Sequence, residues 1–307
     1  MTTNTVSQRR PSMIRRSHTR TRTVLSTIVW YVTVTAISVT TVIPFLWSLT
    51  TSFKSPGEIL QDPLRVIPRD FTFMNYVEVF STVPFGRYII NSLIIALVGI
   101  LTNCIFGAMA GYAFSRLRFR FRGLIFSVFL ATMMIPSVVT MVPTFIILHG
   151  FPLVGGNNIL GQGGTGFINS YWGVILPGAV GAFSIFMMRQ FFASLPAELA
   201  DAARMDGASE IRIFRSIYLP LVQPALAVLS IITFQAYWNS FIWPLIVLND
   251  PNKYTVQIGL ATFKYTYSTN YGPLMAGTMI VSIPVLIIFG LAQKKIIEGA
   301  AFTGINA

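Results

Sequence analysis

Long runs without any Asp, Glu, Lys or Arg are the feature of this sequence that most limits its fold. The longest covers residues 123–188, where His149 is the only side chain that titrates near neutrality. A helix needs about 20 mostly apolar residues to cross the hydrocarbon core of a bilayer. Only 10% of the 307 residues are charged, against about 25% in a typical soluble domain. Such a chain fits lipid as its solvent.

Five such runs predict six helices, because the longest run is interrupted. Its middle, residues 150–170, holds seven glycines and the pair Asn157-Asn158, which indicates a loop between two helices. The five runs are 23–53, 88–115, 123–188, 216–249 and 265–293. The predicted fold class is therefore an all-α membrane protein with six transmembrane helices. We expect three parts, namely a basic N-terminal tail over 1–23, a six-helix domain over 24–296 and a C-terminal tail over 297–307.

The basic residues gather in alternate connections between these runs. Sixteen of the 22 Lys and Arg residues lie in the two tails, the second-to-third connection and the fourth-to-fifth connection. Since basic connections stay on the cytoplasmic side, both termini are expected in the cytoplasm. The same distribution explains the net charge of +12 by membrane topology and argues against nucleic acid as a partner. The first run is longer than a signal-peptide core of about 7–15 residues, and we expect it to remain as an anchor.

The predicted spans contain no charged side chain that could drive transport or catalysis. Proton- and ion-coupled carriers commonly keep such groups within the membrane, although carbonyls and hydroxyls can also bind Na⁺. No Gly-Lys pair is present for a phosphate-binding loop, and the lone Cys104 has no metal-ligating company. We therefore expect no catalytic residue, metal site or cofactor on this chain. A stand-alone carrier or channel and a membrane enzyme or anchor are the alternatives.

The connection over residues 194–220 has the pattern of a short helix, a glycine turn and a second helix. Pro196 suits a first helical turn, and Glu198 and Asp201 come early, where the helix dipole favours anions. Gly207 can end the helix by reversing the chain. A predicted face of small or apolar residues comprises Leu199, Ala202 and Ala203.

The second helix of this connection is expected to begin at Ser209, whose hydroxyl can cap it. Pro220 is expected to open the next membrane helix. On pattern alone, an ordinary helical hairpin lying against the bundle is an equally good interpretation.

This segment resembles the signature loop of permeases in binding-protein-dependent ATP-binding-cassette importers, E-A-A-x-x-x-G followed by x9-I-x-L-P. Residues 201–207 match the first part and 217–220 the second, with Asp201 in place of Glu. In that family the loop forms a coupling helix that fits a groove on the ATPase subunit. The coupling residues that the resemblance implies are Glu198, Asp201, Ala202, Ala203, Asp206, Gly207, Leu219 and Pro220.

Further stretches resemble the sugar-uptake branch, specifically the maltose- and multiple-sugar-type second permease. They are Asn91-Ser92-Leu93, 110–116, Met134-Ile135-Pro136, 169–173, Trp238-Asn239 and Trp243-Pro244-Leu245. The resemblance runs from about residue 25 to residue 300, whereas 302–307 depart from the family's usual ending. It implies a type I importer permease fold in a bacterial or archaeal cell membrane. The implied partners are a second permease, two ATPase subunits that bind ATP and magnesium, and an extracytoplasmic sugar-binding protein.

Four residues are candidates for the substrate path. Sugar sites use aromatic faces for stacking and amides for hydrogen bonds, and Trp238, Asn239 and Trp243 offer both in the fifth run, with Asn91 in the second. The alternative is that the tryptophans pack between helices or lie at the membrane interface. Likewise, the Asn91 amide can tie helices together. The identity of the sugar or polyol is expected to reside in the binding protein.

Overall fold

The computed structural model describes residues 16–264 and 269–304, and all regular structure within them is helical apart from one isolated β-bridge. In chain order, the first elements are α1 (Arg16–Thr51), α2 (Pro56–Gln61), α3 (Met74–Thr82), α4 (Phe85–Arg116), α5 (Arg122–Thr132), α6 (Ser137–His149), α7 (Tyr171–Ile175) and η2 (Leu176–Gly178). They are followed by α8 (Ala182–Ser194), α9 (Glu198–Met205), α10 (Glu210–Ile213), η3 (Phe214–Tyr218) and α11 (Leu219–Leu221). The last are α12 (Gln223–Trp238), α13 (Ile242–Val247), η4 (Pro251–Lys253), α14 (Val256–Ala261) and α15 (Tyr271–Gly304).

Six membrane spans can be recognised when each bent helix pair is counted as one. Three spans are single helices, namely Ser26–Thr51 within α1, the whole of α4, and Tyr271–Leu291 within α15. The other three are pairs: α5 with α6, bent by 104°; α7 and η2 with α8, bent by 44°; and Glu210–Leu221 with α12, bent by 76°. The predicted number of six is therefore reached, but half of the spans are broken.

Two of the three broken spans show what interrupts the helix. The third breaks at Pro136, which lies immediately before α6 and disfavours the α conformation in the residue that precedes it. The fifth stops at Trp238, so that Trp243 and Pro244 belong to the separate helix α13. Apolar composition extends through both breaks, and composition alone could not reveal them.

The ends of the chain also differ from the expected boundaries. Helix α1 begins at Arg16, and α15 continues to Gly304, so the helix does not stop at residue 296. Parts of the predicted tails and of the sixth run, residues 1–15, 265–268 and 305–307, lie outside the described residues.

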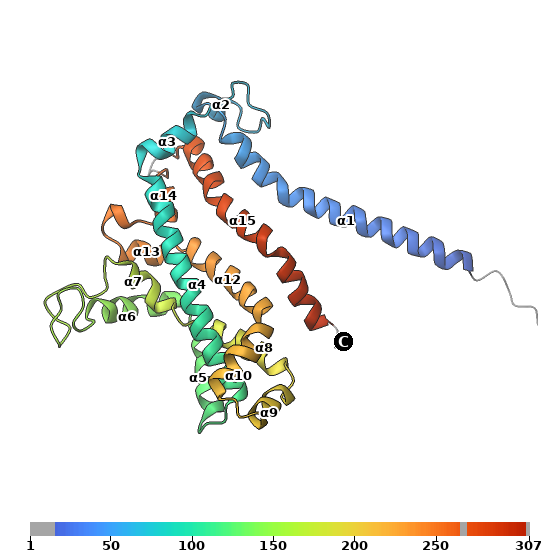
Figure 1. Ribbon diagram of the computed structural model, residues 1–307. Coiled ribbons are helices and arrows are strands. Elements are labelled where there is room, and N and C mark those ends of the chain that lie inside the picture. Colours follow the sequence, from blue (N-terminus) through green and yellow to red (C-terminus); the bar gives the residue numbers. More distant parts are fainter. Residues whose placement is uncertain (1–15, 265–268, 305–307) are drawn as a thin grey trace, which may run out of the picture.

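Helix α4 is the centre of the packing and lies against α8 and α12 (Figure 1). Small residues allow the close approach, since a Cβ atom at Gly111 would stand 2.6 Å from the Cβ atom of Met188. Asn103 joins α4 to the fourth span, because its amide donates to the Gly178 carbonyl at 2.7 Å and accepts from the Ser184 hydroxyl at 2.6 Å. Small residues and bridging polar groups are what hold helices together in lipid.

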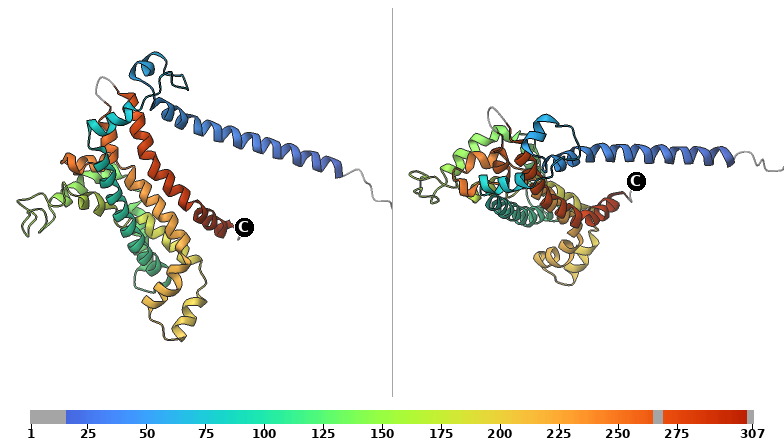
Figure 2. Two further views of the ribbon diagram at one scale, coloured as in Figure 1. Left: turned by 45° about the horizontal axis from the view of Figure 1, so that its top comes forward. Right: turned by 90° about the horizontal axis from the view of Figure 1, so that it is seen from above.

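Helix α1 extends away from the rest of the bundle (Figures 1 and 2). None of its most apolar 18-residue window is buried within the chain. The short helices α2 and α3 lie at one end of the molecule, and α9 and α10 lie at the other (Figure 1). The apolar surface of this window is thus not covered by the part of the chain that the structure describes.

Candidate functional site

The connection between the fourth and fifth spans is a compact hairpin at one end of the molecule (Figure 1). Helix α9 ends in a six-residue capping motif: the Gly207 N–H donates to the Arg204 carbonyl at 3.0 Å, and the Ala208 N–H donates to the Ala203 carbonyl at 2.9 Å. This motif needs a left-handed residue, and Gly207 has φ of +77°. The predicted glycine turn is confirmed.

The second arm of the hairpin also begins as predicted, because the Ser209 hydroxyl accepts from the Arg212 N–H at 3.4 Å at the start of α10. The prediction for Pro220 is wrong. Pro220 lies within α11, near the end of a helical rod over Glu210–Leu221. This rod is the first segment of the bent fifth span and belongs to the hairpin, and the second segment, the apolar helix α12, begins only after the 76° bend. Leu219 is half-buried and Pro220 is exposed on this rod. Pro196 likewise precedes α9, whose first residue is Glu198.

Helix α9 has an inner face and an outer face. Ala200 and Ala203 are buried against the cluster that contains Phe192 and Tyr218. Leu199, Ala202 and Met205 are exposed on the other side, with Met205 at 88%. The predicted face is therefore split, since Ala203 points into the bundle and Leu199 and Ala202 point outward. Successive residues of an α-helix are rotated by about 100° around its axis, so residues 200 and 203 lie on one side of α9 and residues 199, 202 and 205 on another.

Arg204 links the two arms of the hairpin. Its Nη1 lies 2.8 Å from Oδ1 of Asp201, and its Nε lies 2.8 Å from Oε1 of Glu210. The Tyr112 hydroxyl on α4 donates to Oε2 of Glu210 at 2.9 Å. The hydrogen bond from Arg204 lowers the pKa of Glu210, with a smaller contribution from Tyr112. The ion pair between Arg204 and Glu210 and the hydrogen bond from Tyr112 thus attach the hairpin to the end of α4.

The other predicted acids remain on the surface, since Glu198 and Asp206 are both exposed. Tyr112 and Glu210 were not among the residues that the sequence predicts for this site. The only available signal was the stretch 110–116, which contains Tyr112 and which resembles the family.

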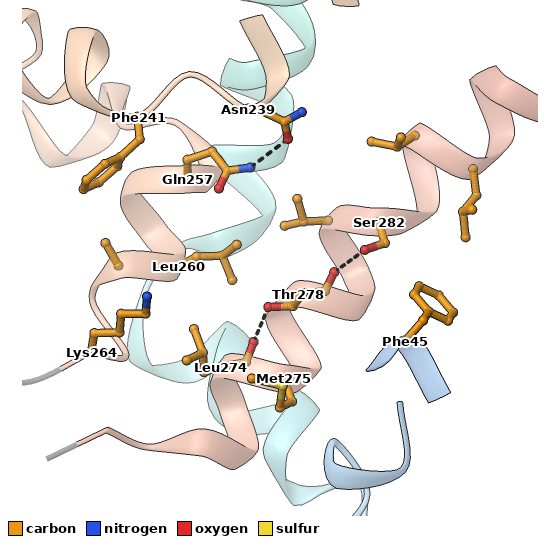
Figure 3. A pocket seen from close by; sticks show the side chains of 14 residues that line it. Phe45, Asn239, Phe241, Gln257, Leu260, Lys264, Leu274, Met275, Thr278 and Ser282 are labelled. Atoms are coloured by element: carbon orange, nitrogen blue, oxygen red, sulfur yellow. Dashed lines mark hydrogen bonds between the residues drawn. The ribbon is translucent and has the colours of Figure 1, made fainter. Parts of the chain in front are cut away.

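A cavity of about 790 Å³ lies between α1, the end of α12, α14 and α15 (Figure 3). The amides of Asn239 and Gln257 lie on one side of it, with Nε2 of Gln257 at 3.5 Å from Oδ1 of Asn239. Thr278 and Ser282 of α15 lie on the opposite side, and their hydroxyls donate to carbonyls of their own helix. Their lone pairs are left to accept hydrogen bonds.

A second cavity of about 990 Å³ lies between α6, α8, α12 and α13. Its polar lining includes Asn103, Thr140, Thr144, Thr233, Asn239 and Ser240. Trp243 also lines this cavity, and its Nε1 donates to the Gly173 carbonyl at 3.2 Å. Asn239 lies between the two cavities because it follows the last residue of α12.

Trp238 and Asn91 line neither cavity. Trp238 is 0% exposed, stacks on Phe234 and donates from Nε1 to the Val281 carbonyl at 3.1 Å. Asn91 is 3% exposed, donates to two carbonyls and accepts from the Tyr171 hydroxyl at 2.7 Å. The geometry corrects the expectation for both residues, which pack and tie helices together. Asn239 and Trp243 do reach a cavity surface.

The part of the chain that the structure describes contains no cluster of three or more His, Cys, Asp and Glu side chains able to hold a metal ion. The chemistry that these sites offer is hydrogen bonding, apolar contact and docking.

Comparison with known proteins assigns the chain to a family. The model of the family described as "Binding-protein-dependent transport system inner membrane component" matches residues 103–296. The arabinooligosaccharides transport system permease protein AraQ of Halalkalibacterium halodurans is 34% identical over 86% of this chain and 91% of its own length. The diacetylchitobiose uptake system permease protein NgcG of Streptomyces coelicolor is 33% identical over 84% of this chain and 82% of its own length.

A solved structure shares the fold. One chain of a bacterial ABC transporter involved in the import of the acidic polysaccharide alginate superposes with a TM-score of 0.76 and 24% identity, covering 93% of this chain and 99% of that chain. The resemblance drawn from residues 201–220 is thereby confirmed, and so is the importer permease fold. The chain belongs to the family of binding-protein-dependent transport system inner membrane components, in which it is a permease subunit and not an enzyme.

Proposed function

We propose that this chain forms one half of the import path for a carbohydrate and couples that path, through α9, to an ATPase on another chain. The proposal for the substrate class rests on relatives named for the transport of arabinooligosaccharides, diacetylchitobiose and lactose. Another relative is named for sn-glycerol-3-phosphate, so a small polyol phosphate is the nearest alternative within the same family.

The outer face of α9 is the observation that carries the coupling role. Leu199, Ala202 and Met205 form an exposed row, while Ala200 and Ala203 anchor the helix from behind. A short helix that is fixed on one side and apolar on the other fits a groove of a partner protein. The exposed acids Glu198, Asp201 and Asp206 would surround the contact. ATP and magnesium would be bound by the ATPase and not by this chain.

The other partners follow from the two ends and the uncovered flank of the molecule. Helix α1, with no part of its apolar window buried, would lie against a second, similar permease and lipid. The basic connections that flank α5 and α9 would face the cytoplasm together with both termini. An extracytoplasmic sugar-binding protein would then dock at the end that carries α2 and α3, and two ATPase subunits at the α9 end.

The substrate path would run beside Asn239. This residue offers an amide to both cavities, and Trp243 offers an indole surface to the larger one. Amides and aromatic faces are the groups that bind sugars.

Affinity purification of the tagged chain in mild detergent tests the proposal. The expected result is that a second permease and a cassette ATPase are recovered with it. Ala202→Glu, on the outer face of α9, should release the ATPase and retain the second permease. Arg215→Gln is the matched control, since Arg215 is exposed on the adjoining rod outside that face.

Two results would contradict the proposal. If Ala202→Glu retains the ATPase at the wild-type level, α9 is not the docking helix. If the chain is purified alone and transports sugar in vesicles without ATP, the chain is a carrier.

A further inference from the structure

A third cavity lies at the same end of the molecule as α9 but behind it. Its volume is about 650 Å³, and it separates the turn between α4 and α5 from the inner side of the hairpin. The lining residues are Ser115, Arg116, Leu117, Arg118, Arg122, Ala197, Ala200, Asp201, Arg204 and Glu210. None of the activities considered above uses this cavity.

The charges around this cavity do not balance. Four guanidinium groups and two carboxylates line it. Both carboxylates lie 2.8 Å from Arg204, which is thereby compensated. Across residues 16–264 and 269–304, no ion pair joins Arg116, Arg118 or Arg122 to a carboxylate. Four positive and two negative groups therefore leave a net charge of +2 at the cavity, and these three arginines have no ion-pair partner in the described part of the chain.

Two of these three guanidinium groups are held in place by backbone carbonyls. Arg116 donates through Nη2 to the carbonyls of Phe192 and Leu195. Arg122 donates through Nη1 to the Leu117 carbonyl at 2.9 Å. Because a guanidinium has five N–H donors, donors remain on both groups. A planar, fixed fork of donors suits the several oxygens of a phosphate group better than it suits a chloride ion.

The surroundings of the cavity identify the source of the phosphate. The turn reads Arg118-Phe119-Arg120-Phe121-Arg122, and Phe121 is 58% exposed. An apolar strip then continues along α5, where Leu124 and Val128 are exposed. Arginines beside exposed aromatic rings, followed by an apolar helix, are typical of the membrane–water interface. Basic pockets at the cytoplasmic ends of transmembrane helices bind anionic lipid headgroups.

We propose that this cavity binds the phosphate headgroup of an anionic phospholipid of the cytoplasmic leaflet, with its acyl chains along the exposed side of α5. Arg116, Arg118 and Arg122 would contact the phosphate oxygens. Since Ala200 lines the same cavity, the headgroup would also lie against the inner side of α9. The lipid site itself does not depend on the proposed carbohydrate or on the ATPase.

The test measures lipid binding to the full purified chain in a neutral detergent by native mass spectrometry. Phosphatidylglycerol and phosphatidylcholine with identical acyl chains are the probes. We expect wild type to retain phosphatidylglycerol in preference. The double variant Arg118→Gln/Arg122→Gln should bind it roughly 30-fold more weakly, which corresponds to about 1 kcal/mol for each basic residue.

Arg120→Gln is the matched control. Arg120 belongs to the same turn, but its guanidinium lies over the Phe121 ring, 4.7 Å from the centroid, and does not line the cavity. The Arg120→Gln variant should retain the wild-type preference for phosphatidylglycerol. Arg118→Gln alone is a second test should the double variant be unstable, because Arg118 is exposed. It should lose about one half of the free-energy difference, or roughly a fivefold weaker binding.

Four results would overturn the proposal. Wild type that binds both lipids equally has no headgroup site, and an Arg120→Gln effect equal to that of the double variant indicates general surface charge. Inorganic phosphate or glycerol 1-phosphate that displaces the lipid at low millimolar concentration indicates a site for a soluble anion. Unchanged lipid binding in the double variant, together with loss of the ATPase, would assign the arginines to the ATPase interface.

Discussion

The Tyr112 hydroxyl donates a hydrogen bond of 2.9 Å to Oε2 of Glu210, which joins the end of α4 to the start of α10 across 98 residues of chain. The second oxygen of the same carboxylate accepts from Arg204 on α9. One carboxylate therefore connects α4, the longest of the single-helix spans, to both arms of the hairpin. Helices α9 and α4 are thus linked through the side chain of Glu210.

Removing the Tyr112 hydroxyl is expected to loosen this connection. Tyr112→Phe should reduce the number of substrate molecules transported per ATP hydrolysed, with a loss of about 1.5–3 kcal/mol in folding free energy because the acceptor is charged. The measurement is the transport-to-hydrolysis ratio of the reconstituted complex. Tyr171→Phe is the control, since it removes a hydroxyl that is bonded to Asn91 instead. Equal ratios in the two variants would contradict the prediction.

The turn at Gly207 is expected to depend on backbone conformation and not on space. Nothing lies within 4 Å of a Cβ atom placed there, but φ is +77°. Gly207→Ala should therefore cost about 1–2 kcal/mol, while Gly207→Asn should cost less because Asn tolerates this region. Gly207→Glu should abolish coupling and leave membrane insertion intact. ATPase recovery and transport rate are the measurements, and an Asn variant that is no better than Ala would argue against strain.

The contact at Gly111 is expected to be limited by space. The added Cβ atom of Gly111→Ala would lie 2.6 Å from the Cβ atom of Met188 and 2.8 Å from the Arg189 backbone nitrogen, so α4 and α8 must separate. Overpacking of this kind typically costs about 1–3 kcal/mol. The measurement is the thermal midpoint in detergent. Gly123→Ala is the control because its Cβ atom would meet nothing, and equal midpoints would contradict the packing described here.

Substitution of Trp238 is expected to reduce stability, whereas substitution of Trp243 is expected to reduce transport. Trp238→Ala should lower the folding free energy by about 3–5 kcal/mol, as is usual for a large buried ring. Trp243→Ala should retain a folded complex and reduce substrate-stimulated transport, because its ring lines a cavity. Thermal midpoint and transport rate are measured for both. A Trp238→Ala complex that is stable but impaired in transport would indicate that Trp238 belongs to the substrate path.

The stability of the hairpin is expected to be insensitive to pH above the ordinary pKa of Glu210. Arg204 holds the pKa of Glu210 below its ordinary value of 4.5, so the stabilisation is complete above that value and is lost as the pH falls through the lower, folded-state pKa. Hydrogen-exchange protection of α9 and α10, corrected for intrinsic rates, should stay constant between about pH 7 and pH 5. Glu210→Gln should have less protection throughout. A decline in wild type within that window would contradict the role of Glu210.

Local rules were sufficient to predict the hairpin. A left-handed cap at Gly207 and a hydroxyl cap at Ser209 depend on residues within one helical turn, and both were predicted from the sequence. The contact between Tyr112 and Glu210 depends instead on how α4 and α10 pack. No spacing rule connects two residues 98 positions apart, so this contact could not be predicted from the sequence.

The membrane spans show where composition stops being informative. In a uniformly apolar run, nothing distinguishes a straight helix from a helix that bends by 104° at Pro136. The same limit applies to the tryptophans. Trp238 and Trp243 are chemically equivalent and only five positions apart, and they diverge because α12 ends between them.

The bend at Val222 determines how a movement of the hairpin would enter the membrane. The rod over Glu210–Leu221 meets α12 there at 76°, and Val222 is buried at the corner. Because the two helical segments meet near a right angle, a displacement along the axis of the first segment would move α12 mostly perpendicular to its own axis. The far end of α12 adjoins Asn239, between the two cavities. A displacement of α9 would therefore reach these cavities as a lateral tilt of α12 and not as a shift of α12 along its axis.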